Sequence, residues 1–570
     1  SKRKDDLIEL VKGQPCRIPY LNGGLFEEDD KKHRSLIFNA QLFKNLFNFF
    51  NQYNFTIYED DPNDHTVAVD PEMLGHIFEN LLEDNKDKGA YYTPKKIVHY
   101  MCQESLIEYL CTSLQIEDEA KEKEAISNFL KKKEIDAILK PEIKNINKAL
   151  DNVKICDPAI GSGAFPMGLL LEIYTAKQTL HAFEYGNTTK FDASAVKLNI
   201  IQNSIYGVDI EKGAVDIARL RFWLSLIVDE PEPKALPNLD YKIVVGNSLV
   251  SKLGDDIIDI DWTLNETSHG LFGAELVRQK GELLKKISTE QKEFFSPDSD
   301  KKKLAADIRN LKIDLLINQL QLMVTTKGIE TKPNGTGKKL GEKTVLYLQT
   351  LGWKNTIKDL QKLKTKTELP LQFFDWKLDF PEVVNEQVSE KLGFDIVIAN
   401  PPYIDSETMV NTGNEDLRIF LSNKLSFCKG NWDIYIAFFD FSYSLLNNTG
   451  NLVFITPDKW ISKPFGDEIR KGLKDNFISI AEAGRKVFEN AKVDSIITFI
   501  AKTPKSHIRI DKFVNGEAIN FSSVDKASLV EPYAFDWLFS DFVSKINQID
   551  KFPNKLSDYA VCENACATSD

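Results

Sequence analysis

The sequence predicts an α/β protein whose core is a mostly parallel, doubly wound sheet. Short apolar segments with strand character recur along the chain, and helical patterns lie between most of them. The first segment ends in a glycine-rich turn, as in nucleotide-binding α/β folds. The expected strands cover residues 153–157, 204–209, 241–245, 394–399, 451–455 and 495–500.

Two regions around the first strands read as helical. Residues 1–88 predict an N-terminal helical connector, because Asp70 and Pro71 have the chemistry of a helix start and apolar residues follow at helical spacing. Residues 115–150 are charged and contain few β-branched runs, so they predict a helical spacer.

A long segment, 251–392, separates the third and fourth strands and predicts a helical insertion. It contains a charged hairpin over 275–323 that breaks at 296–298, and then a Gly/Lys-rich loop at 334–341. Lysines outnumber acidic residues between 327 and 366. That stretch either contacts phosphates or forms an ordinary solvated helix face.

Composition restricts the class of protein. A chain of 570 residues is too long for one compact core, so roughly two to four structural units are expected. No apolar run is long enough to span a membrane, and the start of the chain lacks the apolar region of a secretion signal. Seven scattered cysteines favour a reducing cytoplasm, and Cys562 and Cys566 lack a second pair of zinc ligands. We therefore expect no metal site. The net charge of -13 weighs mildly against extensive phosphate binding.

The strongest local signal for a ligand is the turn after the first strand. Its glycines allow the backbone to approach a ligand closely, and the helix that follows presents free N–H groups. A lone Gly-x-Gly is weak evidence, whereas the complete string is much more specific. The candidate contacts are Asp157, Pro158, Ala159, Gly161, Gly163 and Phe165.

The next two strands also end in polar residues. Asp209, followed by Ile210, stands where a carboxylate accepts hydrogen bonds from both hydroxyls of a ribose. Asn247 and Ser248 follow the third strand, where an amide can meet the edge of an adenine. Each of these would be an ordinary turn in isolation.

The fourth strand ends in Asn400, Pro401, Pro402 and Tyr403, which suggests chemistry on a planar amine. The exocyclic amine of adenine is a poor nucleophile because its lone pair is delocalised into the ring. The Asn400 side-chain oxygen and the Pro401 carbonyl can accept its two hydrogens, and the prolines stiffen the backbone between them. Tyr403 offers a flat face on which a base can stack.

An earlier helix start completes the set. Thr93 and Pro94 precede apolar residues at helical spacing. A helix N-terminus favours a carboxylate ligand, although this string alone would be only a capped helix.

Together, the strings Tyr-Tyr-Thr-Pro at 91–94, Asp-Pro-Ala-x-Gly-Ser-Gly at 157–163 and Asn-Pro-Pro-Tyr at 400–403 resemble gamma-class N6-adenine DNA methyltransferases. Within that class the chain is most similar to type IIG restriction–modification enzymes, from about residue 22 to residue 570. Supporting strings lie at 70–75, 453–460 and 486–491.

The resemblance implies a class I, Rossmann-like fold that uses S-adenosylmethionine (SAM). Thr93 and the glycine turn would line the methionine side of the cofactor, Asp209 would hold the ribose, and Asn247 would meet the adenine, where many family members carry Asp. The implied cofactor-binding residues are Tyr92, Thr93, Asp157, Pro158, Ala159, Gly161, Gly163, Phe165, Asp209, Ile210, Asn247 and Ser248. The implied catalytic residues are Asn400, Pro401, Pro402, Tyr403 and Phe488.

It also implies the domain plan and the substrate, which is adenine flipped out of double-stranded DNA. A nuclease domain and a target-recognition domain are expected outside this fragment, since 142–144 lacks the strand context of a nuclease site. The expected domains are 1–88 (connector), 89–250 (cofactor part with the helical spacer), 251–392 (insertion), 393–505 (catalytic half) and 506–570 (linker to target recognition).

Three alternatives remain open. RNA-base and protein-glutamine methyltransferases share Asn-Pro-Pro-Tyr, but they are usually shorter and lack Tyr-Tyr-Thr-Pro. A non-catalytic DNA-binding subunit would keep the fold without methyl transfer. A Rossmann dehydrogenase is more distant, because its third glycine is missing at the expected spacing.

Overall fold

The computed structural model describes most of the chain between residues 93 and 529. The described residues in that span are 93–116, 118–229, 237, 239–264, 270–294, 299–484, 494–514 and 517–529. Outside it they are 7–11, 14–17, 36–52, 54–55, 68–69, 73, 75, 535–539, 554 and 558–559.

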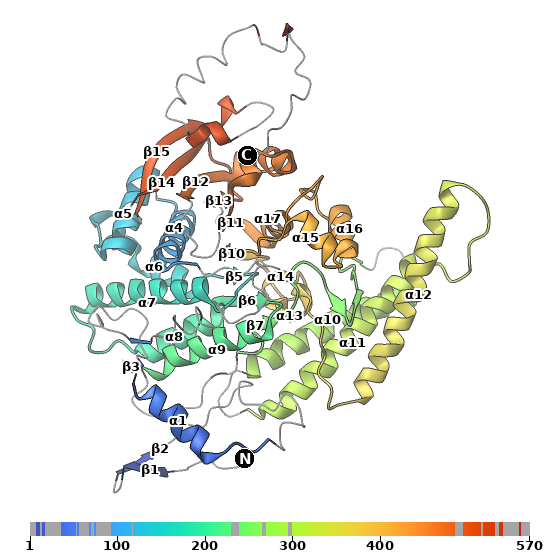
Figure 1. Ribbon diagram of the computed structural model, residues 1–570, viewed down its shortest axis with the longest axis horizontal. Coiled ribbons are helices and arrows are strands. Elements are labelled where there is room, and N and C mark those ends of the chain that lie inside the picture. Colours follow the sequence, from blue (N-terminus) through green and yellow to red (C-terminus); the bar gives the residue numbers. More distant parts are fainter. Residues whose placement is uncertain are drawn as a thin grey trace.

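A nine-stranded sheet forms the centre of the protein, in the order β15-β14-β12-β13-β11-β10-β5-β6-β7 (Figure 1). Five neighbouring strands are parallel: β7 (Ile243–Val245), β6 (Ile205–Asp209), β5 (Ile155–Asp157), β10 (Phe394–Ala399) and β11 (Leu446–Pro457). β13 (Ser495–Ala501) runs antiparallel to β11. The remaining strands of this edge are β12 (Phe477–Gly484), β14 (His507–Val514) and β15 (Glu517–Asp525).

The predicted doubly wound α/β fold is confirmed, and all six expected strands are present. The chain runs outward from β5 to β7, then returns to β10 on the other side of β5. This reversal opens a crevice at the carboxyl ends of β5 and β10, where ligands bind in such sheets.

Side chains of successive strand residues point to opposite faces of the sheet, so each face has its own core. In β10, Ile396 and Ile398 join one hydrophobic cluster, and Val397 and Ala399 join the other. The first cluster is covered by α4 (Lys95–Leu114), α5 (Glu119–Lys132), α6 (Ile143–Asn152), α7 (Ala164–Tyr185), α8 (Ala193–Asn203) and α9 (Lys212–Ile227). The second is covered by α13 (Trp376–Asp379), α14 (Pro381–Val384), α15 (Ser406–Asn411), α16 (Glu415–Lys424), α17 (Ile434–Leu445) and α18 (Asp467–Gly472).

The expected insertion contains three long helices with their own hydrophobic cluster. They are α10 (Gly270–Phe294), α11 (Lys301–Lys327) and α12 (Lys338–Thr365), and they extend to one side of the sheet (Figure 1). The hairpin α10–α11 was expected. α12 occupies the lysine-rich stretch, for which a solvated helix face was one of the two predictions, and it begins within the loop expected at 334–341. The short hairpin β8 (Lys252–Leu253) and β9 (Asp256–Ile257) precedes them.

Several apolar residues before 392, the expected end of the insertion, pack against the central sheet and not within the insertion. Phe374, Trp376, Phe380 and Val383 join the same cluster as β10, because their apolar side chains cover one face of the sheet. The lysines of α12 are partly paired within the protein: Lys354 with Glu330, Lys362 with Asp359 and Lys364 with Asp314. A phosphate-binding role for the others stays a prediction.

The two ends of the chain differ from the sequence-based expectation. The described part of 1–88 contains α1 (Ala40–Phe50) and paired short strands that were not predicted. These strands are β1 (Leu7–Val11), β2 (Gln14–Arg17), β3 (Asn54–Phe55) and β4 (Ala68–Val69). The helix expected after Asp70 lies outside the described residues, apart from Met73 and Gly75. At the other end, the expected linker begins with β14 and β15, which complete the sheet edge because alternate side chains such as Ile508 and Ile510 are buried there.

Short 3-10 helices connect several of these elements: η3 (Ala137–Glu142), η5 (Asp458–Ile461), η6 (Pro464–Gly466), η7 (Lys474–Asn476), η8 (Lys526–Ser528) and η9 (Asp536–Phe539). Within the described residues, no helix has the length and apolar character required to cross a membrane.

Candidate active site

The glycine turn predicted as the ligand site joins β5 to α7 at the carboxyl edge of the sheet. The Asp157 carboxylate accepts a hydrogen bond from the N–H of Ala159 at 3.0 Å, which starts the turn. Gly163 has a φ of +89°, and an added Cβ would lie 3.1 Å from the Cβ of Ala218 in α9. A side chain is therefore disfavoured at Gly163 both by backbone conformation and by space.

Asp209 ties the end of β6 to this turn. Its carboxylate accepts from the N–H of Gly161 at 2.8 Å and from the N–H of Glu211 at 2.9 Å. Burial raises the pKa of the Asp209 carboxyl above its ordinary value, while these backbone donors act in the opposite direction. Asp209, which was predicted to hold a ribose, thus also fixes the backbone of the glycine turn.

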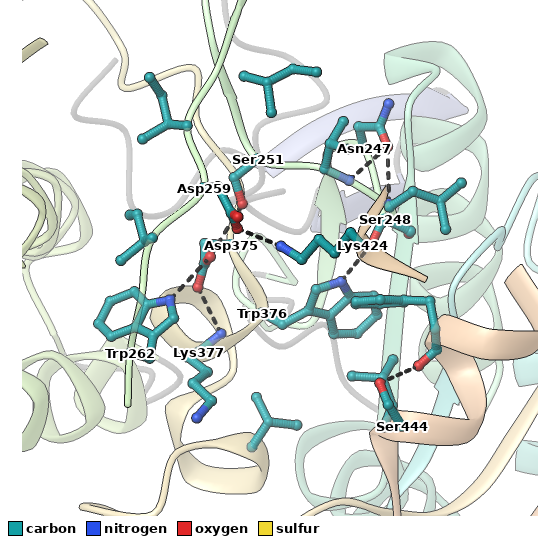
Figure 2. A pocket seen from close by; sticks show the side chains of 18 of the residues that line it. Asn247, Ser248, Ser251, Asp259, Trp262, Asp375, Trp376, Lys377, Lys424 and Ser444 are labelled. Atoms are coloured by element: carbon teal, nitrogen blue, oxygen red, sulfur yellow. Dashed lines mark hydrogen bonds and ion pairs between the residues drawn. The ribbon is translucent and has the colours of Figure 1, made fainter. Parts of the chain in front are cut away.

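Asn247 and Ser248 stand in the wall of a neighbouring cavity of about 380 Å³ (Figure 2). The Asn247 side-chain oxygen accepts from the N–H groups of Leu249 at 3.0 Å and Val250 at 3.3 Å. Its amide nitrogen is consequently the atom suited to meet an acceptor on an adenine edge. The Ser248 hydroxyl donates to the carbonyl of Pro158, which links this loop to the glycine turn.

Residues near the end of the expected insertion brace the same loop. The indole N–H of Trp376 donates to the Ser248 carbonyl at 2.9 Å. The neighbouring Asp375 carboxylate accepts from Ser251 at 3.1 Å and from Trp262 at 3.3 Å, as Figure 2 shows. The Trp376–Ser248 hydrogen bond connects the expected insertion to the expected cofactor part, whereas the Asp375 contacts lie within the expected insertion.

The loop after β10 carries the predicted catalytic residues. The Asn400 amide donates to the Thr93 hydroxyl at 3.1 Å, across 307 positions of sequence. The Tyr403 hydroxyl donates to the carbonyl of Ile455 in β11 at 3.2 Å. The loop end is held where Ile434 N–H donates to the Ile404 carbonyl at 2.8 Å. Pro401 is buried and Pro402 is half-buried between them.

Most predicted site residues therefore lie in the turns at the carboxyl ends of β5, β6, β7 and β10, but several do not contribute in the same way. Phe165 is buried in the core under the turn, and Ile210 is 65% exposed. Tyr92 and Phe488 lie outside the described residues. Their predicted roles stay predictions.

Three neighbours of the site were missed by sequence reasoning. The Tyr435 ring lies 6.4 Å from the Tyr403 ring at 79°. The Arg221 guanidinium, buried within α9, donates to the Ser162 carbonyl at 3.0 Å. A Cβ added to Gly75 would lie 2.6 Å from the Ser162 hydroxyl oxygen. No sequence signal separated Arg221 from the other charged residues of α9, such as Arg219.

The site suits the charge distribution of SAM. One carboxylate oxygen of Asp157, Oδ2, is buried and has no hydrogen-bond partner among the described residues. Burial raises the pKa of Asp157 well above its usual range, and the nearby Asp209 raises it further. A cationic donor, such as the ammonium of the methionine moiety, would satisfy this oxygen. The residues at the crevice thus fit the cofactor.

Comparison with known proteins identifies relatives of the chain. The model of the Eco57I restriction-modification methylase family matches residues 203–499, just over half of the chain. The match contains Asp209, Asn247 and the loop after β10, and it starts beyond the glycine turn.

Two relatives have related descriptions. A predicted type II restriction enzyme and methyltransferase of Methanocaldococcus jannaschii is 28% identical over 544 residues, which cover 88% of this chain and 44% of that protein. The type II restriction enzyme and methyltransferase Eco57I of Escherichia coli is 30% identical over 168 residues, covering 28% of this chain and 16% of that protein. The chain thus spans less than half the length of either relative.

Among solved structures, the type IIL restriction–modification enzyme MmeI in complex with DNA matches with a TM-score of 0.39 and 12% identity. The match covers 80% of this chain and 43% of that chain.

Proposed function

This chain belongs to the Eco57I restriction-modification methylase family, and from that premise we propose that it methylates N6 of adenine in double-stranded DNA. Its doubly wound sheet is the fold of a class I methyltransferase, and its cofactor is SAM. The observation that carries the proposal is the Asn400–Tyr403 loop at the carboxyl end of β10, beside the glycine turn.

We assign cofactor binding to the turns after β5, β6 and β7. Asp157 and the glycine turn would hold the methionine moiety, Asp209 the ribose and Asn247 the adenine. When bound, SAM supplies a methyl group on a positively charged sulfur, and that C–S bond breaks as the new N6–C bond forms. The described backbone contacts keep these three turns in register before the ligand arrives.

The catalytic loop would orient the target amine. The Asn400 side-chain oxygen and the Pro401 carbonyl accept the two N6 hydrogens, so that the nitrogen lone pair turns toward the methyl group. N6 then keeps one hydrogen and loses the other to water. Tyr403 would stack on the base, with Phe488 as the second aromatic residue. Alignment of donor and acceptor is the main catalytic contribution expected of such a site.

The partner is double-stranded DNA with the target base flipped out of the helix, because N6 is otherwise hidden in the duplex. We also propose the domain plan expected from the sequence, with nuclease and target-recognition domains elsewhere in a longer protein. The greater length of the relatives supports this part of the proposal.

The test is to incubate unmethylated plasmid DNA with this chain and methyl-labelled SAM, and then to identify the labelled nucleoside by mass spectrometry. We expect label in N6-methyladenine. RNA and a cell protein extract serve as competing substrates, since the alternative methyltransferases would label these instead. A chain extended at its C-terminus should be tested in parallel. Absence of labelled adenine from both forms would overturn the proposal.

A further inference from the structure

The contact between Thr93 and Asn400 joins the expected cofactor side of the site to the catalytic side. Thr93 is 5% exposed, and its hydroxyl receives the Asn400 amide N–H at 3.1 Å. Family resemblance assigned Thr93 only to the cofactor, and nothing in the sequence predicted this hydrogen bond.

Thr93 is held on a rigid support. It is followed by Pro94, the N-cap of α4, and in α4 Met101 and Cys102 are fully buried. α4 packs so closely on α7 that a Cβ at Gly168 would lie 2.9 Å from the Cys102 sulfur. The position of the Thr93 hydroxyl is therefore set by the core and not by a loose loop.

A hydroxyl has one proton to donate and lone pairs that accept. By itself it tolerates either orientation of the facing amide. Once the hydroxyl donates its single hydrogen bond to an anion, its oxygen can only accept a hydrogen bond from the facing amide. The amide must then present its N–H side. The N-terminus of α4 favours such an anion at this position.

We infer that Thr93 is a positioning residue that makes the orientation of the Asn400 amide depend on the cofactor. The cofactor carboxylate would accept a hydrogen bond from the Thr93 hydroxyl, while the Thr93 oxygen accepts the Asn400 N–H, so that the Asn400 oxygen is directed at the target amine. This inference rests on the proposed function. Its consequence is that the cofactor fixes the orientation that the Asn400 amide has in the structure, with the side-chain oxygen left for the target amine.

The experiment compares Thr93→Val, which keeps the shape and removes the hydroxyl, with Thr93→Ser, which keeps the hydroxyl. Steady-state kcat and the KM for SAM are measured on plasmid DNA, using whichever of the two chain forms is active. The affinity for S-adenosylhomocysteine is measured by calorimetry without DNA, and it should be weaker in Thr93→Val than in Thr93→Ser. We expect Thr93→Val to lower kcat at saturating SAM by roughly 10- to 100-fold. Thr93→Ser should retain most of it. Thr336→Val, in the exposed loop before α12, is the matched control and should match the wild type.

A second measurement protects the conclusion from a folding defect. In an Asn400→Ala background, Thr93→Val should lower the residual single-turnover rate by less than about two-fold, because the coupled partner is already absent. The inference is overturned if Thr93→Val raises only the KM for SAM, or if Thr93→Ser is as impaired as Thr93→Val. A wild type that never labels adenine overturns the proposed function instead, whatever the variants do.

Discussion

The cofactor side and the catalytic side of the crevice are supported differently. On the cofactor side, the side chains of Asp157, Asp209 and Asn247 accept hydrogen bonds from backbone N–H groups two positions further along the chain. On the catalytic side, Asn400 contacts Thr93 across 307 positions, and Tyr403 contacts Ile455 across 52. Each cofactor turn thus has a local hydrogen bond in addition to its long-range contacts, whereas the side chains of Asn400 and Tyr403 contact distant segments.

This difference predicts that substitutions on the two sides separate into binding and turnover defects. Asn400→Ala should have the largest effect, lowering kcat by roughly 10²–10³-fold, as loss of one oriented polar group does in other active sites. The affinity for S-adenosylhomocysteine, measured by calorimetry, should stay within about two-fold, as expected of a group that acts mainly in the transition state.

Asn334→Ala, on the exposed loop of the insertion, provides the control for that measurement. Wild-type turnover in Asn400→Ala would contradict the proposed mechanism.

Asp209→Ala should show the opposite behaviour. It removes the acceptor for Gly161 and Glu211 as well as the expected ribose contact, so the affinity for S-adenosylhomocysteine should fall by roughly 10-fold or more. Activity should recover partly at high SAM concentration. If affinity were unchanged and only kcat fell, the division between the two sides would be wrong.

Gly75→Ala tests whether a remote segment supports the cofactor turn. The added methyl group would lie 2.6 Å from the Ser162 hydroxyl oxygen and must displace it. We expect cofactor affinity to fall by roughly five-fold, about 1 kcal/mol. Ser162→Gly removes the obstructing side chain, so Gly75→Ala should have no further effect in that background. Equal losses in both backgrounds would exclude this contact as the cause.

The smallest effect is expected for Tyr403→Phe. The ring remains in place for the base, and only the hydrogen bond to Ile455 is lost, which is worth about 0.5–1.5 kcal/mol. We expect kcat to fall by roughly three-fold. Tyr403→Ala should instead remove most of the turnover. Similar kcat values for the Phe and Ala variants would show that the hydroxyl, and not the ring, is what matters.

The local pattern of apolar residues was sufficient to predict the central strands of the sheet. The apolar segments of β5, β6 and β10 are buried on both faces, so their composition identifies them without knowledge of their neighbours. β12, β14 and β15 were not predicted. β15 at the sheet edge mixes exposed and half-buried side chains without regular alternation, which makes its pattern ambiguous until its partner strand is known.

The features of the site can likewise be divided into those predicted from local sequence and those seen only in the structure. Residue types and their spacing predicted the glycine turn, the acidic end of β6 and the Asn-Pro-Pro-Tyr loop, because each is a continuous string whose function depends on local backbone geometry. The Thr93–Asn400 hydrogen bond, the approach of Gly75 to Ser162 and the bracing of Ser248 by Trp376 came only from the folded chain. Such contacts join residues far apart in sequence, and only the packing of helices on the sheet brings them within hydrogen-bonding distance.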